Sequence, residues 1–182
     1  MDAGCPVAGR AAERGVCLKV APPVVADLTA LVKLGQLCHL ESRFARLPYD
    51  GERVAQRFAR MIEQPLSTTF FVAARQTSGE LHGLMIGTID EYFFSRERIA
   101  SSIFLLVHPE HRGGLAAIKM VMAFRAWAHA RAAAEVYIGV ASGVSIHRTG
   151  RFLSKLGLTL TGGNYSAWLP VPPCDADSAA IC

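Results

Sequence analysis

Apolar residues recur at helical spacing in the first third of the chain. Residues 24–46 carry them at Val25, Leu28, Leu31, Val32, Leu34 and Leu37, which predicts one helix over this segment. The sequence Pro48-Tyr49-Asp50-Gly51 breaks the pattern, and Asp50 is a suitable N-cap for a second helix that runs to Gln64. Pro65 ends that second helix.

Shorter apolar runs between turn residues predict strands. We expect strands at 16–20, 70–74 and 81–89, with residues 77–80 as a hairpin turn before the third. The continuous apolar run 99–107 is typical of a central strand that is buried on both faces.

The second half of the chain alternates helices and strands. We predict a helix from 114 to 131, a strand at 135–140, and a helix from 145 to 156 that ends at Gly157. Two last strands are expected at 158–160 and 165–169. The predicted fold is one three-layer α/β domain over residues 16–169, with a mixed, mainly antiparallel sheet and helices on both faces. Residues 1–15 and 170–182 are expected to be disordered.

Composition narrows the class of protein. The chain is 51% hydrophobic and 19% charged, as in globular proteins, and has no run of about 20 apolar residues that would span a membrane. The first 15 residues lack the apolar core of a signal peptide, so we expect a cytoplasmic protein. Five scattered cysteines without a C-x-x-C pair predict neither disulfides nor a metal site. A net charge of +4 is too small to indicate nucleic-acid binding.

The segment LLVHPEHRGGLAAIKMVMAFRAW, residues 105–127, carries the strongest functional signal. A strand, a glycine turn and a helix in this order direct free backbone N–H groups at an anion. Arg112 adds a positive charge beside the turn, and we expect it to contact the ligand. Six further cations follow before Gly157, namely Lys119, Arg125, Arg131, Arg148, Arg151 and Lys155, with Glu135 as the acidic residue among them. For Lys119, Arg125 and Arg131 a solvated helix face is the expected role.

The succession VHPEHRGG, helix, EVYIGV, helix, KLGL and TGGNYSAWL resembles the GNAT superfamily of N-acetyltransferases, in its compact bacterial or phage form. The resemblance implies a GNAT fold with a splayed central strand pair, and acetyl-CoA, or another acyl-CoA, as co-substrate. The family's Arg/Gln-x-x-Gly-x-Gly/Ala turn, which binds the pyrophosphate, would begin at Arg112 and end at Ala117. Leu115 then stands where glycine is expected, although a one-residue contraction would put Gly114 and Ala116 in the glycine places. The residues expected to bind the co-substrate are Leu106, Val107, Arg112, Gly113, Gly114, Leu115, Ala116, Ala117 and Ser142.

The same resemblance implies direct attack of a primary amine on the thioester, without a covalent enzyme intermediate, so no catalytic cysteine is needed. Cys38 is the one cysteine inside a predicted helix, and we expect it to be a core residue. Glu91 is the first choice for the base, with Asp90 and Glu41 as alternatives. The family's usual tyrosine acid falls at Leu153, which leaves Tyr165 as the candidate phenol. Ser145 or Ser142 would replace a missing asparagine and bond the pantetheine amide; the candidate catalytic residues are therefore Glu91, Tyr165 and Ser145.

The acceptor is expected to be a small-molecule or peptide amine, bound over the first two helices and the loop 92–98. Two alternatives remain open: a non-catalytic GNAT-fold protein that binds acyl-CoA or has a regulatory role, and an N-acyltransferase for longer acyl chains. Dimers are the commonest closed assembly, so a homodimer is the default expectation.

Overall fold

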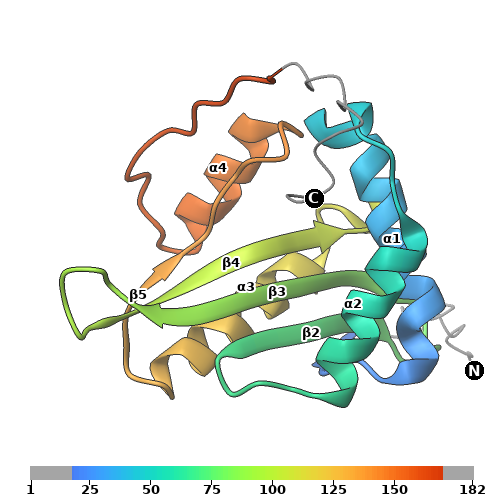
Figure 1. Ribbon diagram of the computed structural model, residues 1–182, viewed down its shortest axis with the longest axis horizontal. Helices are drawn as coiled ribbons and strands as arrows, with labels where there is room; N and C mark the ends of the chain where they lie inside the picture. The colour runs from blue at the N-terminus through green and yellow to red at the C-terminus, as the bar shows by residue number, and fades with distance from the viewer. Residues whose placement is uncertain (1–17, 170–182) are drawn as a thin grey trace, which may run out of the picture.

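A five-stranded sheet forms the centre of the protein (Figure 1). The computed structural model describes residues 18–169. The strands are β1 (Leu18–Ala21), β2 (Thr69–Gln76), β3 (Leu81–Glu91), β4 (Arg98–Val107) and β5 (Ala133–Tyr137), in the spatial order β1-β2-β3-β4-β5. The first four pair antiparallel and β5 pairs parallel with β4. The predicted mixed, mainly antiparallel sheet is confirmed, whereas the termini predicted to be disordered lie outside the described residues.

Residues 18–169 form four α-helices: α1 (Leu28–Leu40), α2 (Gly51–Glu63), α3 (Leu115–His129) and α4 (Ile146–Lys155). Helices α1 and α2 lie on one face of the sheet and α3 on the other, while α4 stands apart from it (Figure 1). Three short 3₁₀ helices, η1 (Val25–Asp27), η2 (Arg43–Arg46) and η3 (Pro109–His111), lie beside them. The Asp50 side chain accepts a hydrogen bond from the Arg53 amide at 2.9 Å, which confirms the predicted N-cap of α2. None of the helices in the described part of the chain is long and apolar enough to cross a bilayer.

The single helix predicted over residues 24–46 is wrong, because the segment forms η1, α1 and η2 in succession. At its C-terminal end, Ser42 adopts an extended backbone conformation and its hydroxyl accepts a hydrogen bond from the Phe44 amide at 3.1 Å. A serine side chain that bonds a nearby amide competes with the helical ladder, so the chain turns at this position.

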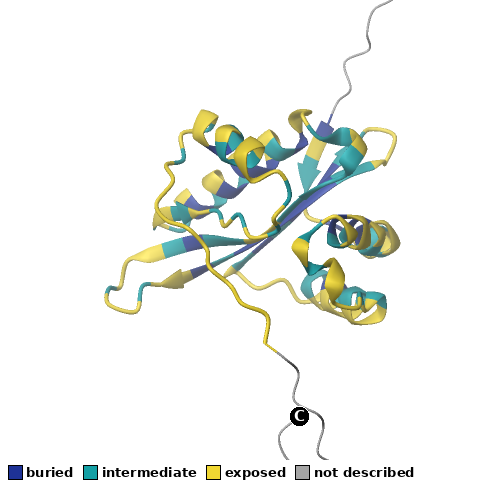
Figure 2. Cartoon of the chain, turned by 90° about the horizontal axis from the view of Figure 1, so that it is seen from above, coloured by how far each residue is buried: buried dark blue, intermediate teal, exposed yellow. Residues whose placement is uncertain are grey.

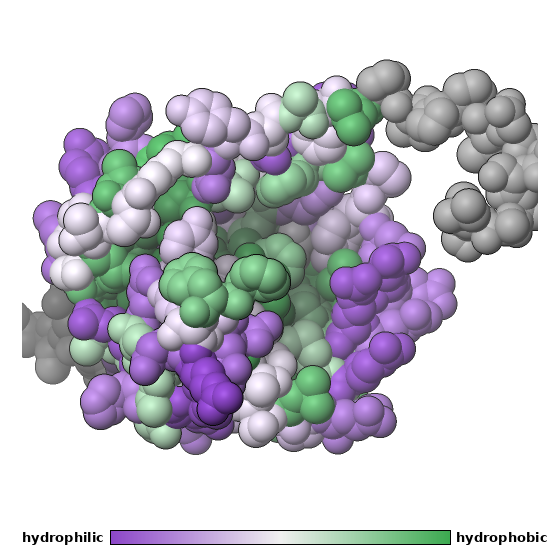
Figure 3. Space-filling model, turned by 60° about the vertical axis from the view of Figure 1, so that its left-hand side comes forward, coloured by the Kyte–Doolittle hydropathy of each residue, from purple (hydrophilic) through white to green (hydrophobic). Residues whose placement is uncertain are grey.

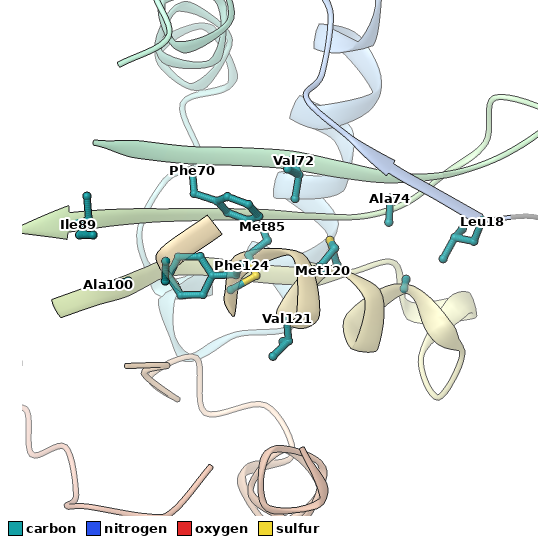
Figure 4. Packing of buried hydrophobic residues seen from close by; sticks show 12 residues of the cluster. Leu18, Phe70, Val72, Ala74, Met85, Ile89, Ala100, Met120, Val121 and Phe124 are labelled. Atoms are coloured by element: carbon teal, nitrogen blue, oxygen red, sulfur yellow. The ribbon is translucent and has the colours of Figure 1, made fainter. Parts of the chain in front are cut away.

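The core has two parts, one on each face of the sheet (Figure 2). On the face that we call the α3 face, Met120 and Phe124 pack on Phe70, Met85 and other strand residues (Figure 4). A Cβ atom at Gly87 would lie 2.5 Å from the Phe124 ring, so only glycine permits this close approach of α3. On the opposite face, which we call the α1–α2 face, α1 and α2 cover Ala73, Leu84 and Ile86.

The central strands β4 and β5 separate after a short paired segment. Their pairing extends from Arg98 to Ser101 on β4, and the other side of residues 102–107 has no strand partner in the described chain. A bulge lies at the point of separation, because Ile86 pairs with Phe104 while the next residue, Gly87, pairs with Ser102. A bulge bends a strand and increases its local twist. The splayed strand pair implied by the resemblance is confirmed, although β5 ends before the predicted residue 140.

The two strands predicted at 158–160 and 165–169 do not form in the described chain. The segment 158–169 instead arches over the molecule from α4 towards η2 (Figure 1). Within this segment, the Trp168 ring centroid lies 4.1 Å from Cζ of the Arg46 guanidinium, and the ring packs edge-on against Phe44. Leu160 and Tyr165 remain 89% and 99% exposed, so the apolar residues that suggested strands gain no burial in the sheet.

Candidate active site

The glycine turn before α3 leaves backbone N–H groups without intrahelical acceptors. Gly113 has a φ of +90°, and Gly114 is the N-cap of α3 without a side-chain cap. The amides of residues 115–117 belong to the first helical turn, where no carbonyl lies one turn earlier to accept them. The Arg112 and Gly114 amides are bonded within the turn, at 3.4 Å and 3.3 Å. The first turn of α3 therefore has the geometry to bind an anion, with the amides of Leu115, Ala116 and Ala117 as donors.

Arg112 is a tether of this turn. Its Nη1 atom lies 2.6 Å from the Glu41 carboxylate at the end of α1, and its Nε donates to the Val107 carbonyl at 3.4 Å. Both contacts hold the guanidinium against protein groups. A direct contact between Arg112 and a ligand stays a prediction.

Arg148 is the cation that the structure adds to the turn. A Cβ atom at Gly113 would lie 3.2 Å from Nη2 of Arg148, which comes from the first turn of α4. Arg148 is exposed and has no ion pair or hydrogen bond within residues 18–169. The sequence placed it in a basic region, but no local signal indicated that α4 brings it to Gly113.

The free edge of β4 leads from the turn towards the splay. Leu106 and Val107 lie in this half-buried part of β4. Ile103 and Phe104 beside the bulge are 52% and 49% exposed, so an apolar surface is available next to unpaired backbone. Figure 3 shows a hollow in the molecule with hydrophobic side chains on its floor.

Ser142 connects the loop after β5 to the α1–α2 region. Its carbonyl accepts the Arg43 amide at 2.9 Å, and its hydroxyl accepts the Val144 amide at 3.3 Å. The hydroxyl can still donate a hydrogen bond, so its predicted bond to the co-substrate remains a prediction.

The structure does not bring the three predicted catalytic residues together. Glu91 pairs with Arg98, nine positions along β4 from Val107, which is about 30 Å at the rise of a strand. Glu91 lines a depression with Asp90, Arg98, Arg131 and neighbouring residues. Ser145 is the left-handed N-cap of α4, and Tyr165 is almost fully exposed on the arch. Their catalytic roles stay untested predictions.

Strand alternation separates Glu91 from the expected acceptor face. Ile89 packs in the core of the α3 face, and Glu91, two residues later, lies on the same side. Asp90 points to the α1–α2 face. It pairs with Ile99 on β4, and Ile99 pairs with Glu135 on β5, so all three side chains lie on this face. The acceptor was expected over the α1–α2 face, so Asp90 and Glu135 are on the suitable side.

The sequence reasoning missed two residues of this face, Glu135 and Tyr137, whereas Tyr92 lies in the loop 92–98 that it placed beside the acceptor. The Tyr92 hydroxyl donates to the Glu135 carboxylate, and this hydrogen bond, followed by desolvation, raises the pKa of Tyr92. Tyr137 pairs with Ser101 at the last position before the strands separate. The alternation in Glu135-Val136-Tyr137, with Val136 packed on the α3 face, was the signal that could have identified them.

Cys38 and Leu153 are core residues. Burial raises the pKa of the Cys38 thiol, which donates to the Val107 carbonyl at 3.8 Å. A thiol that is disfavoured as thiolate is a poor nucleophile, so the prediction of a core cysteine is confirmed. Leu153, at the position of the family's tyrosine, is also buried.

Several solved structures with the same architecture are acetyltransferases, at low sequence identity. Glucosamine-6-phosphate N-acetyltransferase from Arabidopsis thaliana superposes with a TM-score of 0.66 and 16% identity, over 85% of this chain and 99% of that one. The fold is the GNAT fold. An aminoglycoside acetyltransferase from an uncultured soil metagenomic sample, solved with sisomicin, gives a TM-score of 0.61 and 16% identity over 85% and 96% of the two chains. A transcriptional regulator from Bacillus halodurans C-125 gives a TM-score of 0.67 and 14% identity, over 84% of this chain and 100% of that one.

No protein-family model matches the sequence, and no curated protein matches it. The likeness to these GNAT structures is therefore one of fold.

Proposed function

We propose that the protein is an acyl-CoA-dependent N-acyltransferase that transfers an acetyl group to a primary amine by direct attack in a ternary complex. One observation carries this proposal: the Gly113 turn before the open N-terminus of α3 lies beside the Arg148 guanidinium, which has no partner within residues 18–169, close to the free edge of β4. Free amides, a helix dipole and a cation together suit a diphosphate. An extended chain beyond the diphosphate can pair with the unpaired edge of residues 102–107.

The proposed assignment gives each group one task. The amides of Leu115, Ala116 and Ala117 bind the diphosphate, and Arg148, which comes from α4, neutralises its charge. Gly113 allows the close approach, because a side chain there would meet Arg148. Main-chain N–H groups near the bulge at Ile103 polarise the thioester carbonyl, so that charge developing on its oxygen is stabilised.

The amine must lose a proton before or during the attack. We assign this step to Glu135, which lies on the α1–α2 face and is oriented by the Tyr92 hydroxyl. Asp90 shares this face and is the second candidate, while Glu91 lies on the other. The phenol of Tyr137, at the last paired position before the splay, is the group that we propose for protonating the departing thiolate.

The identity of the amine and the length of the acyl chain are open within this proposal. A small-molecule or peptide amine would enter over α1, α2 and the loop 92–98. The exposed Ile103 and Phe104 leave room for an acyl chain longer than acetyl along the splay.

A non-catalytic acyl-CoA-binding or regulatory protein is the second candidate function. The lack of a phenol at two candidate positions favours this function. The position of the family's tyrosine holds the buried Leu153, and the phenol of Tyr165 is exposed on the arch. Under this proposal the α3 turn and Arg148 still bind the diphosphate, but no acyl group is transferred.

Thermal unfolding with acetyl-CoA, desulfo-CoA and ATP, followed by thiol release over a panel of amines, tests the two functions. A ligand that binds only the folded state raises Tm by mass action. We expect a higher Tm with both CoA compounds than with ATP, and thiol release that depends on an amine. A higher Tm without thiol release would support the non-catalytic binding protein. No rise in Tm with either CoA compound would overturn both candidate functions.

A further inference from the structure

Glu80, His82 and His111 meet at one point of the surface although they come from three segments. Glu80 ends the turn between β2 and β3, His82 is the second residue of β3, and His111 ends η3. One ligand atom from each residue lies within 4.8 Å of the other two. Two imidazoles and a carboxylate are a common ligand set for transition metals.

The separations fit a single metal ion. The His111 Nε2 atom is 3.0 Å from Glu80 Oε1, and the His82 Nε2 atom is 3.8 Å from Glu80 Oε2. Two ligand atoms that each lie about 2.0 to 2.1 Å from a tetrahedral zinc ion are about 3.3 Å apart. These two distances lie on either side of this value, and rotation of the histidine rings completes the geometry.

His82 provides an independent sign of an absent partner. Its Nε2 atom is buried and has no hydrogen-bond partner among the described residues. A buried polar atom without a partner is costly and uncommon. The His82 and His111 rings are stacked, with centroids 3.6 Å apart and planes 9° apart. A tilt of the rings would direct both Nε2 atoms towards one ion, which would then satisfy the His82 nitrogen.

We propose that Glu80, His82 and His111 bind a divalent first-row transition metal ion, with zinc as the best-suited member. Imidazole nitrogens disfavour Mg²⁺ and Ca²⁺, which prefer oxygen ligands. Three protein ligands leave one tetrahedral position for water or another small ligand. A depression with a volume of about 320 Å³, lined by both histidines, Glu110, Arg112, Gly114 and other residues, gives access to it.

The ion would connect the β2–β3 turn to the segment that precedes α3. His111 directly precedes Arg112, Gly113 and Gly114, so a metal bound to its imidazole restrains the turn in which Gly113 lies beside Arg148. Metal binding by these three side chains does not require that the protein be an acyltransferase.

Zinc titration of the chelator-treated full-length protein, without any CoA compound, tests the site. Competition with a chromogenic zinc indicator measures the affinity, and Tm measures the coupling to folding. We expect one zinc ion per chain with these ligands, and at least a roughly ten-fold weaker affinity in H82A, H111A and E80Q. The matched control is H129A, which removes an exposed histidine at the end of α3 and should retain the wild-type affinity. Mg²⁺ should not raise Tm.

Glu80 is exposed, so E80Q should stay folded even if loss of the half-buried His82 unfolds the protein. Equal zinc affinity in wild type, H111A and E80Q would overturn the site and assign any binding to other groups, including the cysteines. Because the titration contains no CoA compound, failure of zinc binding and failure of acyl-CoA binding are separate results.

Discussion

Arg112 and Glu41 form an ion pair of 2.6 Å that joins the turn before α3 to the end of α1. Their side chains are 32% and 36% exposed, so solvent screening leaves this pair a small contribution to stability. The pair fixes a position: Glu41 holds the Arg112 guanidinium that the sequence assigned to the ligand, whereas Arg148, beside the turn, has no ion pair within the described residues 18–169.

Replacement of Arg148 should weaken acyl-CoA binding more than replacement of its neighbour on α4. In R148A the diphosphate loses a charge-assisted contact, which we expect to weaken the affinity about ten-fold. R151A removes an exposed arginine from the same helix and should change the affinity little. Isothermal titration with desulfo-CoA measures both. Equal losses in the two variants would indicate a general effect of charge.

Alanine at Gly113 should destabilise the fold and the ligand site together. The backbone at this position has a φ of +90°, which an L-residue adopts at a cost of roughly 1 to 2 kcal/mol. Denaturant unfolding should show that loss for G113A. The control G162A lies on the exposed arch, with nothing within 4 Å of the added Cβ, and should differ from wild type by less than about 0.5 kcal/mol. A G113A protein as stable as G162A would contradict the strain at Gly113.

E135Q tests the proposed base. Loss of a general base typically lowers the rate by about 100-fold or more, while the amide retains the shape and the bond from Tyr92. We expect a lower kcat with an unchanged Kd for desulfo-CoA. E91Q is the comparison, since Glu91 lies on the α3 face and should leave kcat near the wild-type value. The opposite ranking of the two variants would restore Glu91 as the base.

The metal-free protein should lose stability as the pH falls below 6.5 because of His82. Burial lowers the pKa of this group from its ordinary value of 6.5, while His111 and His108 lower it further and Glu80 raises it. The unfolded chain therefore binds the proton first, so this contribution is complete above pH 6.5 and decreases as the pH falls towards the folded-state pKa. Urea unfolding between pH 7.5 and 5 should show a weaker pH dependence for H82Q than for wild type. Identical slopes would show that His82 does not titrate differently on folding.

Local patterns predicted much of the fold. The N-cap Asp50 and the apolar spacing located α2 closely, because both signals act within a few residues. The glycine pair after β4 and the apolar positions that follow it correctly predicted the turn and α3. The prediction of strands in the segment 158–169 was wrong, because a strand needs a pairing partner and apolar residues alone do not specify one.

The amino-acid sequence by itself determined the α/β class, the strand–turn–helix unit at residues 105–127 and the core role of Cys38, since these follow from periodicity, caps and composition. Tertiary structure alone decided that Arg148 meets Gly113, that Glu91 and Glu135 lie on opposite faces, and that Glu80, His82 and His111 converge. Such relationships depend on strand register and on how separate elements pack, which no local stretch of residues encodes.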